Sequence, residues 1–259
     1  MIDKDKPVAV VSGGTTGIGL ECVKRLILSG WNVAYFGQAS ERVEASKQSL
    51  DAIVAEHDAR VLAGVVDLRD VPSVDAFFHL AQQELGPVRG LVCNAGYSPK
   101  GPDGRVPLAD VELEEWQDVL AVNQTGAMIC CQHALKSMTN VGHGRIVLIG
   151  SLAGRTVPKI AGASYAASKS AIVGLARSIV SEYSMYGITA NTVCPGRILT
   201  EMTGDTSQPE NLEALDRIPI GRLGKTSDIA RLVEFLMRAN SDFINGAIID
   251  VNGGEFVPP

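Results

Sequence analysis

The sequence predicts a single α/β domain over residues 1–259, a three-layer, doubly wound parallel sheet of about seven strands with helices on both faces. Short aliphatic and β-branched runs alternate with longer segments of helical periodicity from residue 8 to residue 251, a pattern typical of parallel sheets. Of the 259 residues 46% are hydrophobic, which is enough for one sizeable core. No linker composition divides the chain, so we expect one domain.

The first strand and the turn after it indicate a dinucleotide site. The apolar run 8–11 leads into Ser-Gly-Gly-Thr-Thr-Gly-Ile-Gly at 12–19, and helical spacing follows up to Gly30. Glycines let the backbone turn tightly and approach a pyrophosphate, whose charge is favoured by the helix N-terminus. A glycine-rich loop can also be a plain turn, but its place between a strand and a helix favours dinucleotide binding.

The remaining elements continue the alternation. Strands are predicted at 32–36, 60–66, 90–93, 144–149, 189–193 and 247–251, and helices at 40–56, 71–85, 116–138, from near Tyr165 to about Tyr186, and 226–238. The polar segment at about 197–217 has little strand character and is predicted to be a mobile lid over the carboxyl ends of the strands.

Charge and composition narrow the possible partners. The net charge of −6 and the isoelectric point near 5.3 argue against nucleic acid or an anionic membrane surface, because both require a basic face. Residues 1–6 lack the apolar core of a signal peptide, and no apolar run approaches the roughly 20 residues of a membrane span. The five cysteines lack C-x-x-C spacing and the four histidines do not cluster. We expect a cytoplasmic protein with reduced thiols and no metal.

The end of the second strand bears on the choice of cofactor. A dinucleotide-binding fold that prefers NAD usually places a carboxylate there, on the ribose 2′-hydroxyl. Here Gly37 and Gln38 occupy that place, and the first acidic residue is Glu41. Ser40 and Arg42 could donate to a 2′-phosphate. The pattern favours NADP and leaves NAD possible.

A tyrosine and a lysine four residues apart suggest a proton-transfer pair. On a helix, Tyr165 and Lys169 project from the same face, one turn apart. A nearby lysine cation is expected to lower the tyrosine pKa and to tune the phenol as a general acid or base. An ordinary surface pair has the same spacing, so the surroundings must decide.

The sequence pattern alone does not decide the roles of two further polar residues, Asn123 and Ser151. Asn123 lies within an otherwise apolar helix, where an unbonded amide is costly; a structural kink and a catalytic role are weighed evenly. Ser151 follows the fifth strand, but the stretch 150–154 lacks the G-x-S-x-G pattern of a hydrolase nucleophile.

Taken together, these motifs resemble the short-chain dehydrogenase/reductase family, in its single-domain Rossmann-type form, from Val8 to Gly254. The family's glycine motif is matched by Gly13, Gly17 and Gly19, with Ser12 in place of threonine, and its Asn-Asn-Ala-Gly stretch by residues 93–96 with Cys93 as a departure that weakens a sheet contact. The family's catalytic tetrad is matched by four residues in order: Asn123, Ser151, Tyr165 and Lys169.

The resemblance implies an NAD(P)-dependent oxidoreductase that moves hydride between nicotinamide and a carbonyl or secondary alcohol. Tyr165 would give its proton to the oxygen that Ser151 orients, Lys169 would lower the tyrosine pKa and bind the nicotinamide ribose, and Asn123 would anchor a water. The implied cofactor contacts are Gly13, Thr15, Thr16, Gly17, Ile18, Gly19, Gly37, Gln38, Asp67, Leu68, Asn94, Ala95, Gly96, Tyr165, Lys169, Pro195, Gly196, Ile198 and Thr200.

The sequence is compatible with three functions. The segments 218–224 and 251–254 resemble 3-oxoacyl-(acyl carrier protein) reductases, although Lys136 and Ser181 stand where those enzymes receive the acidic carrier on arginines. A dehydrogenase of a small alcohol, sugar or cyclic hydroxy compound is the alternative, and a non-catalytic dinucleotide-binding regulator is a distant third.

Two expectations concern charge and assembly. Lys159 and Arg197, near the predicted mouth of the site, could receive an anionic substrate but are expected to be solvated. By resemblance, a homotetramer is expected through the two long helices and the last strand. Small residues there would allow close approach of helices, or could pack inside one subunit: Ala127, Ala134, Ala166, Ala171, Gly174 and Ala176.

Overall fold

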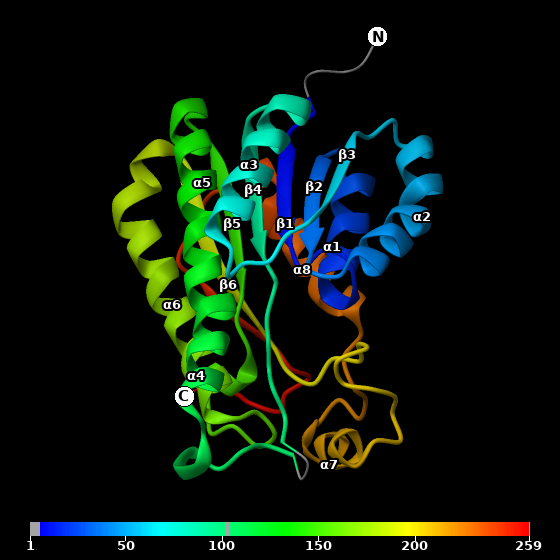
Figure 1. Ribbon diagram of the computed structural model, residues 1–259, viewed down its shortest axis with the longest axis vertical. Coiled ribbons are helices and arrows are strands. Elements are labelled where there is room, and N and C mark those ends of the chain that lie inside the picture. The colour runs from blue at the N-terminus through cyan, green and yellow to red at the C-terminus, as the bar shows by residue number, and fades with distance from the viewer. Residues whose placement is uncertain (1–5, 102–103, 259) are drawn as a thin grey trace.

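A seven-stranded parallel sheet forms the centre of the protein (Figure 1). The computed structural model describes residues 6–101 and 104–258, so the prediction about residues 1–5 lies outside it. The sheet order is β3-β2-β1-β4-β5-β6-β7. The strands are β1 Val8–Ser12, β2 Asn32–Gly37, β3 Val61–Val65, β4 Val88–Cys93, β5 Gly144–Ile149, β6 Ile188–Pro195 and β7 Ile248–Val251. The predicted fold class is confirmed.

Helices cover both faces of the sheet and bury two separate hydrophobic clusters. One cluster joins the sheet to α1 Gly17–Leu28, α2 Ser40–Glu56 and α8 Thr226–Met237. The other joins it to α3 Val71–Leu85, α5 Gly126–Val141 and α6 Ala163–Tyr183. Strands buried on both sides read as continuous apolar runs, which is why β1 and β2 could be recognised from the sequence.

Two regions differ from the sequence prediction. The helix expected at 116–138 is α4 Leu113–Leu120 and α5, joined by a π-turn at Ala121–Thr125. The polar segment 197–217 contains a helix, α7 Pro209–Arg217. Its proline is at the start of the helix, where the missing N–H has no intrahelical partner to lose, so Pro209 marks a helix start rather than a loop.

The sheet order reverses between β1 and β4, and this places a crevice at their carboxyl ends. The loops that follow β1, β2, β4, β5 and β6 converge there. Figure 1 shows α7 at this end of the molecule, beyond the edge of the sheet. The fold therefore gathers segments that are far apart in the sequence around one site.

The structure also bears on the small residues of the long helices, on Cys93 and on membrane spans. Ala127, Ala134 and Ala176 are buried within the subunit, so these three pack inside the chain, whereas Gly174 on α6 is exposed. Cys93 is buried, with its Sγ 3.8 Å from the Ala127 carbonyl oxygen and 4.0 Å from Cys131 Sγ. No helix within the described ranges is long and apolar enough to cross a membrane.

Arg145 secures the end of the sheet opposite the crevice. Its side chain is 1% exposed and donates to the carbonyl oxygens of Gly144 (2.9 Å), Gly187 (3.2 Å), Arg238 (3.2 Å) and Ala239 (2.9 Å). One guanidinium thus joins the start of β5 to the turn before β6 and the segment after α8.

Replacing this arginine tests that role. Arg145→Met is expected to lower the free energy of unfolding by about 3 kcal/mol, because four carbonyl groups lose the buried, charged donor that they share. Urea denaturation measures the change. Arg231→Met, at an exposed position of α8, serves as the control and is expected to stay within about 0.5 kcal/mol of the wild type. Equal stability of both variants would contradict a structural role for Arg145.

Candidate functional site

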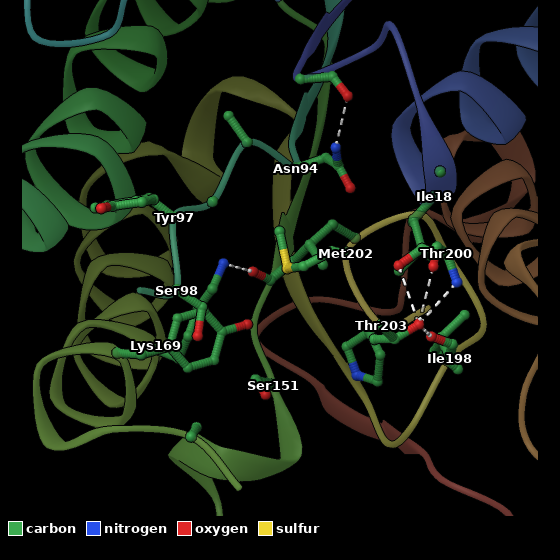
Figure 2. A pocket seen from close by; sticks show the side chains of 18 of the residues that line it. Ile18, Asn94, Tyr97, Ser98, Ser151, Lys169, Ile198, Thr200, Met202 and Thr203 are labelled. Atoms are coloured by element: carbon green, nitrogen blue, oxygen red, sulfur yellow. Dashed lines mark hydrogen bonds between the residues drawn. The ribbon is translucent and has the colours of Figure 1, made fainter. Parts of the chain in front are cut away.

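A cavity of about 1050 Å³ lies at the carboxyl ends of the strands. Figure 2 shows Ser151 and Lys169 on one side of it and Ile198, Thr200 and Thr203 on the other. Almost all the residues implied by the sequence line this cavity: Gly13, Thr15, Thr16, Gly17, Ile18, Gly37, Gln38, Asp67, Leu68, Asn94, Ala95, Gly96, Ser151, Tyr165, Lys169, Pro195, Gly196, Ile198 and Thr200. Gly19 and Asn123 lie behind its wall.

The turn after β1 is fixed by side chains from β1 and β4. Asn94 donates through Nδ2 to the carbonyl oxygens of Ser12 (3.2 Å) and Gly13 (2.9 Å). In return, Ser12 Oγ accepts from the backbone N–H groups of Asn94 (3.1 Å) and Ala95 (3.2 Å). Serine therefore fills the place of the expected threonine, and its hydroxyl oxygen accepts two backbone hydrogen bonds.

The glycines of this turn each meet a distinct constraint. Gly13 and Gly17 have φ of 63° and 55°, the left-handed region that favours glycine. A Cβ on Gly19 would collide with the Gly13 carbonyl oxygen. Gly19 thus permits the close contact between helix and turn that places the other two glycines at the cavity.

The N-terminus of α1 opens on the cavity through Thr16, Gly17 and Ile18. Its first turn contains no acidic residue and its N-cap, Thr16, makes no side-chain capping bond within the described structure. The free N–H groups and the positive end of the helix dipole there suit a pyrophosphate. The donor set therefore fits a dinucleotide.

Beyond β2, the cavity is lined by a small charged network. Gln38 Nε2 donates to Asp67 Oδ2 at 2.9 Å, and Arg69 pairs with the same carboxylate at 2.7 Å. The Arg69 guanidinium lowers the pKa of Asp67. Arg42 also lines the cavity and lies 3.5 Å from Glu201, whereas Ser40 is exposed outside it.

At the other end, Tyr165 and Lys169 face the cavity from successive turns of α6. Lys169 is 4% exposed, donates to the Ile149 carbonyl oxygen at 2.8 Å, and has its Nζ 5.7 Å from the centre of the Tyr165 ring. Burial lowers the pKa of Lys169 to about 8. The structure thus brings the predicted pair together, one turn apart.

The predicted direction of the tyrosine pKa is wrong for this chain. Burial raises the pKa of Tyr165, and the nearby Ser151 hydroxyl only partly opposes the rise. Loss of solvent on burial is the main cause of the rise, and burial also disfavours the lysine cation. The phenol of this structure is consequently a protonated acid at neutral pH.

Asn123 lies in the π-turn and is 1% exposed. Its Oδ1 accepts from Tyr97 N–H at 2.7 Å, and its Nδ2 donates to the Tyr97 carbonyl (3.0 Å) and to Ser168 Oγ (2.9 Å). The amide is fully bonded, and it ties the loop after β4 to α6. Asn123 thus lies at a structural irregularity of the helix, and such π-turns often accompany functional sites.

Several cavity residues were missed from the sequence, among them Arg69, Tyr97 and Phe256. Arg69 is two residues beyond Asp67, so its position near a predicted contact was the available signal. Tyr97 directly follows the Asn-Ala-Gly stretch and gave a similar signal. Phe256 reaches the cavity from the C-terminal segment, and no sequence pattern indicated that this segment contributes to the site.

The comparisons with known proteins decide the family. The family model for short chain dehydrogenases matches residues 7–211. The chain belongs to this family. Among its relatives is the 3-oxoacyl-(acyl carrier protein) reductase MabA of Mycobacterium tuberculosis, which is 35% identical over 245 residues, covering 95% of this chain and 91% of the relative. Levodione reductase of Leifsonia aquatica is 30% identical over 257 residues, covering 96% and 93%.

Solved structures agree with this assignment. A blue fluorescent protein from a metagenomic library, solved in complex with NADPH, has a TM-score of 0.86 and 32% identity, and the match covers 97% of this chain and 98% of that one. This short-chain dehydrogenase is accordingly a nicotinamide-dependent oxidoreductase that acts on CH–OH or C=O groups.

The buried lysine predicts a pH dependence of stability. The pKa of Lys169 falls from 10.5 in the unfolded chain to about 8 in the fold, so between these values the unfolded state binds more protons and the lysine's destabilising effect fades as pH rises. The stability of the wild type relative to Lys169→Met is expected to increase by about 2–3 kcal/mol from pH 7.5 to pH 10.5.

Urea denaturation at several pH values checks this expectation. The control is Lys136→Met, at an exposed position of α5, whose stability difference from the wild type is expected to stay constant because solvent surrounds this ammonium. A flat profile for Lys169→Met would show that Lys169 keeps its proton in the folded chain.

Proposed function

We propose that this short-chain dehydrogenase is an NADP-dependent reductase of a carbonyl compound of the 3-oxoacyl type. The observation that carries the proposal is the convergence of Ser151, Tyr165 and Lys169 on one end of a cavity whose other parts suit a dinucleotide. A regulator that only binds a dinucleotide has no need of this group.

The residues that would hold the cofactor follow from the geometry. The turn 13–19 and the start of α1 suit the pyrophosphate, Asp67 and Leu68 lie where the adenine is expected, and Pro195 and Gly196 line the end near Tyr165. When bound, the nicotinamide supplies or accepts the hydride. Lys169 Nζ, held at the Ile149 carbonyl, would bond the nicotinamide ribose.

Tyr165 and Ser151 divide the work on the substrate oxygen. Tyr165, which burial keeps protonated, donates its proton to the carbonyl oxygen during reduction. Ser151 accepts from Ala153 N–H at 3.1 Å, which fixes its oxygen and leaves its hydroxyl proton for the substrate. Asn123 positions the loop at Tyr97 and anchors the path by which the proton is replaced.

Charge at the end of β2 supports NADP over NAD. Gln38 stands where a carboxylate would repel a 2′-phosphate, and Arg42 and Arg69 line the same part of the cavity. Three carboxylates also line the cavity near these arginines: Asp67 lies 2.7 Å and Asp118 3.6 Å from Arg69, and Glu201 lies 3.5 Å from Arg42. The support for NADP is therefore the absence of a carboxylate at position 38, with the two guanidinium groups as possible phosphate donors.

The substrate is less constrained by the comparisons, because relatives of similar identity include both MabA and levodione reductase. A small carbonyl substrate is preferred here over one bound to an acidic carrier. On the long helices, Lys136 and Ser181 replace the expected arginines, and Glu182 directly follows Ser181 in the sequence. We also propose a homotetramer, supported by the exposed Gly174 on α6.

Removal of the Tyr165 hydroxyl tests the catalytic proposal. Tyr165→Phe is expected to reduce kcat by about 10²–10⁴-fold, the usual contribution of a general acid, while the dissociation constant of NADPH changes little. Turnover and fluorescence titration measure the two quantities. Tyr183→Phe, at the end of α6, is the matched control. Full turnover by Tyr165→Phe would favour the non-catalytic alternative.

Paired titrations test the cofactor. NADPH is expected to bind at least about tenfold more tightly than NADH, a difference of about 1.4 kcal/mol, by quenching of intrinsic fluorescence. Gln38→Asp is expected to reverse the order, because a carboxylate there bonds the ribose 2′-hydroxyl and repels a phosphate. Tighter NADH binding by the wild type would instead favour an oxidising dehydrogenase.

A further inference from the structure

Arg197 is a cation in the cavity wall that the proposed chemistry does not use. It directly follows Pro195 and Gly196 at the end of β6 and lines the same cavity as Ser151 and Tyr165. The sequence led us to expect a solvated side chain. Instead Arg197 is partly buried, and its Nη2 atom is inaccessible to solvent, whereas Lys159 is exposed as expected.

The orientation of Arg197 is fixed by α7. Its Nε donates to Asn211 Oδ1 at 2.6 Å. Asn211 is fully buried and donates through Nδ2 to the carbonyl oxygens of Thr203 (2.9 Å) and Asp205 (2.5 Å). The asparagine is therefore held from three sides, and it holds the guanidinium in one position.

A second nitrogen of the guanidinium is left without a partner among the described residues. Within the described residues, Nη2 of Arg197 makes no hydrogen bond. The carboxylates nearby are engaged elsewhere: Glu255 accepts from Arg217 Nε at 3.1 Å, and Glu210 lies 3.7 Å from Lys100. A buried donor on a cation that lacks its own carboxylate is costly.

We propose that the substrate carries a carboxylate and that the Arg197 guanidinium binds it, which makes the substrate an oxo acid or the corresponding hydroxy acid. A guanidinium matches a carboxylate in charge and geometry. Burial lowers the pKa of Arg197, Glu210 and Glu255 oppose this shift, and Arg217 adds to it. A guanidinium titrates so far above neutral pH that the side chain stays charged. The inference rests on the proposed carbonyl reduction and narrows its substrate.

An alternative role for Arg197 is to anchor α7 through its bond to Asn211. In that case its loss would disturb the wall of the cavity for every substrate alike. The two roles differ in one readout, the ratio of kcat/KM for an acid to that for its uncharged ester.

The experiment compares acetoacetate with ethyl acetoacetate as substrates, with NADPH, for the wild type and three variants. Arg197→Met removes the charge, Arg197→Lys keeps it, and Asn211→Ala removes the anchor while leaving the arginine. For Arg197→Met, kcat/KM for acetoacetate is expected to fall about 10- to 100-fold, the loss of one charged hydrogen bond, and kcat/KM for the ester to change less than about threefold. Arg197→Lys is expected to recover most of the acid preference.

The outcomes separate the inference from the function on which it rests. For Asn211→Ala, acid and ester are expected to lose activity together. Equal losses of acid and ester in Arg197→Met, or a wild type that reduces only the ester, would overturn the carboxylate site and leave the reductase intact. A wild type that binds NADPH but reduces neither compound would overturn both.

Discussion

The contact between Asn94 and the turn after β1 is the constraint on which the site depends. Strands β1 and β4 are neighbours at the point where the sheet order reverses. Without this contact, the loops that follow the two strands would be free to separate. Four hydrogen bonds join Asn94 and Ala95 to Ser12 and Gly13 across this point. The glycine turn and the Ala95-Gly96 strip thereby form one rigid surface, and a rigid surface is what the binding of a long, flexible dinucleotide requires.

A second constraint is the burial of the polar groups beside this surface. Lys169, Asn123 and Ser168 are buried, and each has a hydrogen-bond partner among the described residues. Satisfied polar groups in a low dielectric are held in fixed positions, because moving one leaves another unpaired. The π-turn at Ala121–Thr125 fits this picture, since it places the Asn123 amide between Tyr97 and Ser168 where a regular helix would have carried it elsewhere. The cost of burial also appears in the lowered pKa of Lys169.

Most of the architecture could be predicted from periodicity, because strands buried on both faces and amphipathic helices leave strong local patterns. The bounds of α2, α3 and β5 agree with the prediction to the residue. What could not be predicted depended on burial or on weak local signals. The helix α7 packs on only a small cluster of Ala214, Ile218 and Leu223, so its apolar pattern is short. The pKa of Tyr165 depends on the degree of burial, which spacing along the chain does not reveal. The partial burial of Arg197 has the same origin.

The division between rigid sheet and variable lid explains why the reaction class is clearer than the substrate. The groups proposed to act on the cofactor and the carbonyl come from strand ends and α6, which the two large clusters hold in place. The segment from Arg197 to Arg217 rests on a cluster of three buried residues and on hydrogen bonds made by Thr203 and Asn211. Thr203 Oγ1 bonds the Thr200 N–H and the Ile198 carbonyl (Figure 2). Asn211 bonds the Thr203 carbonyl. Ile198 joins the start of the segment to one of the large clusters, and the bond from Arg197 Nε to Asn211 Oδ1 adds to these polar contacts. In such a segment, one buried cation influences both the shape of the wall and its charge, and substrate choice follows from a few side chains that the rest of the fold does not constrain.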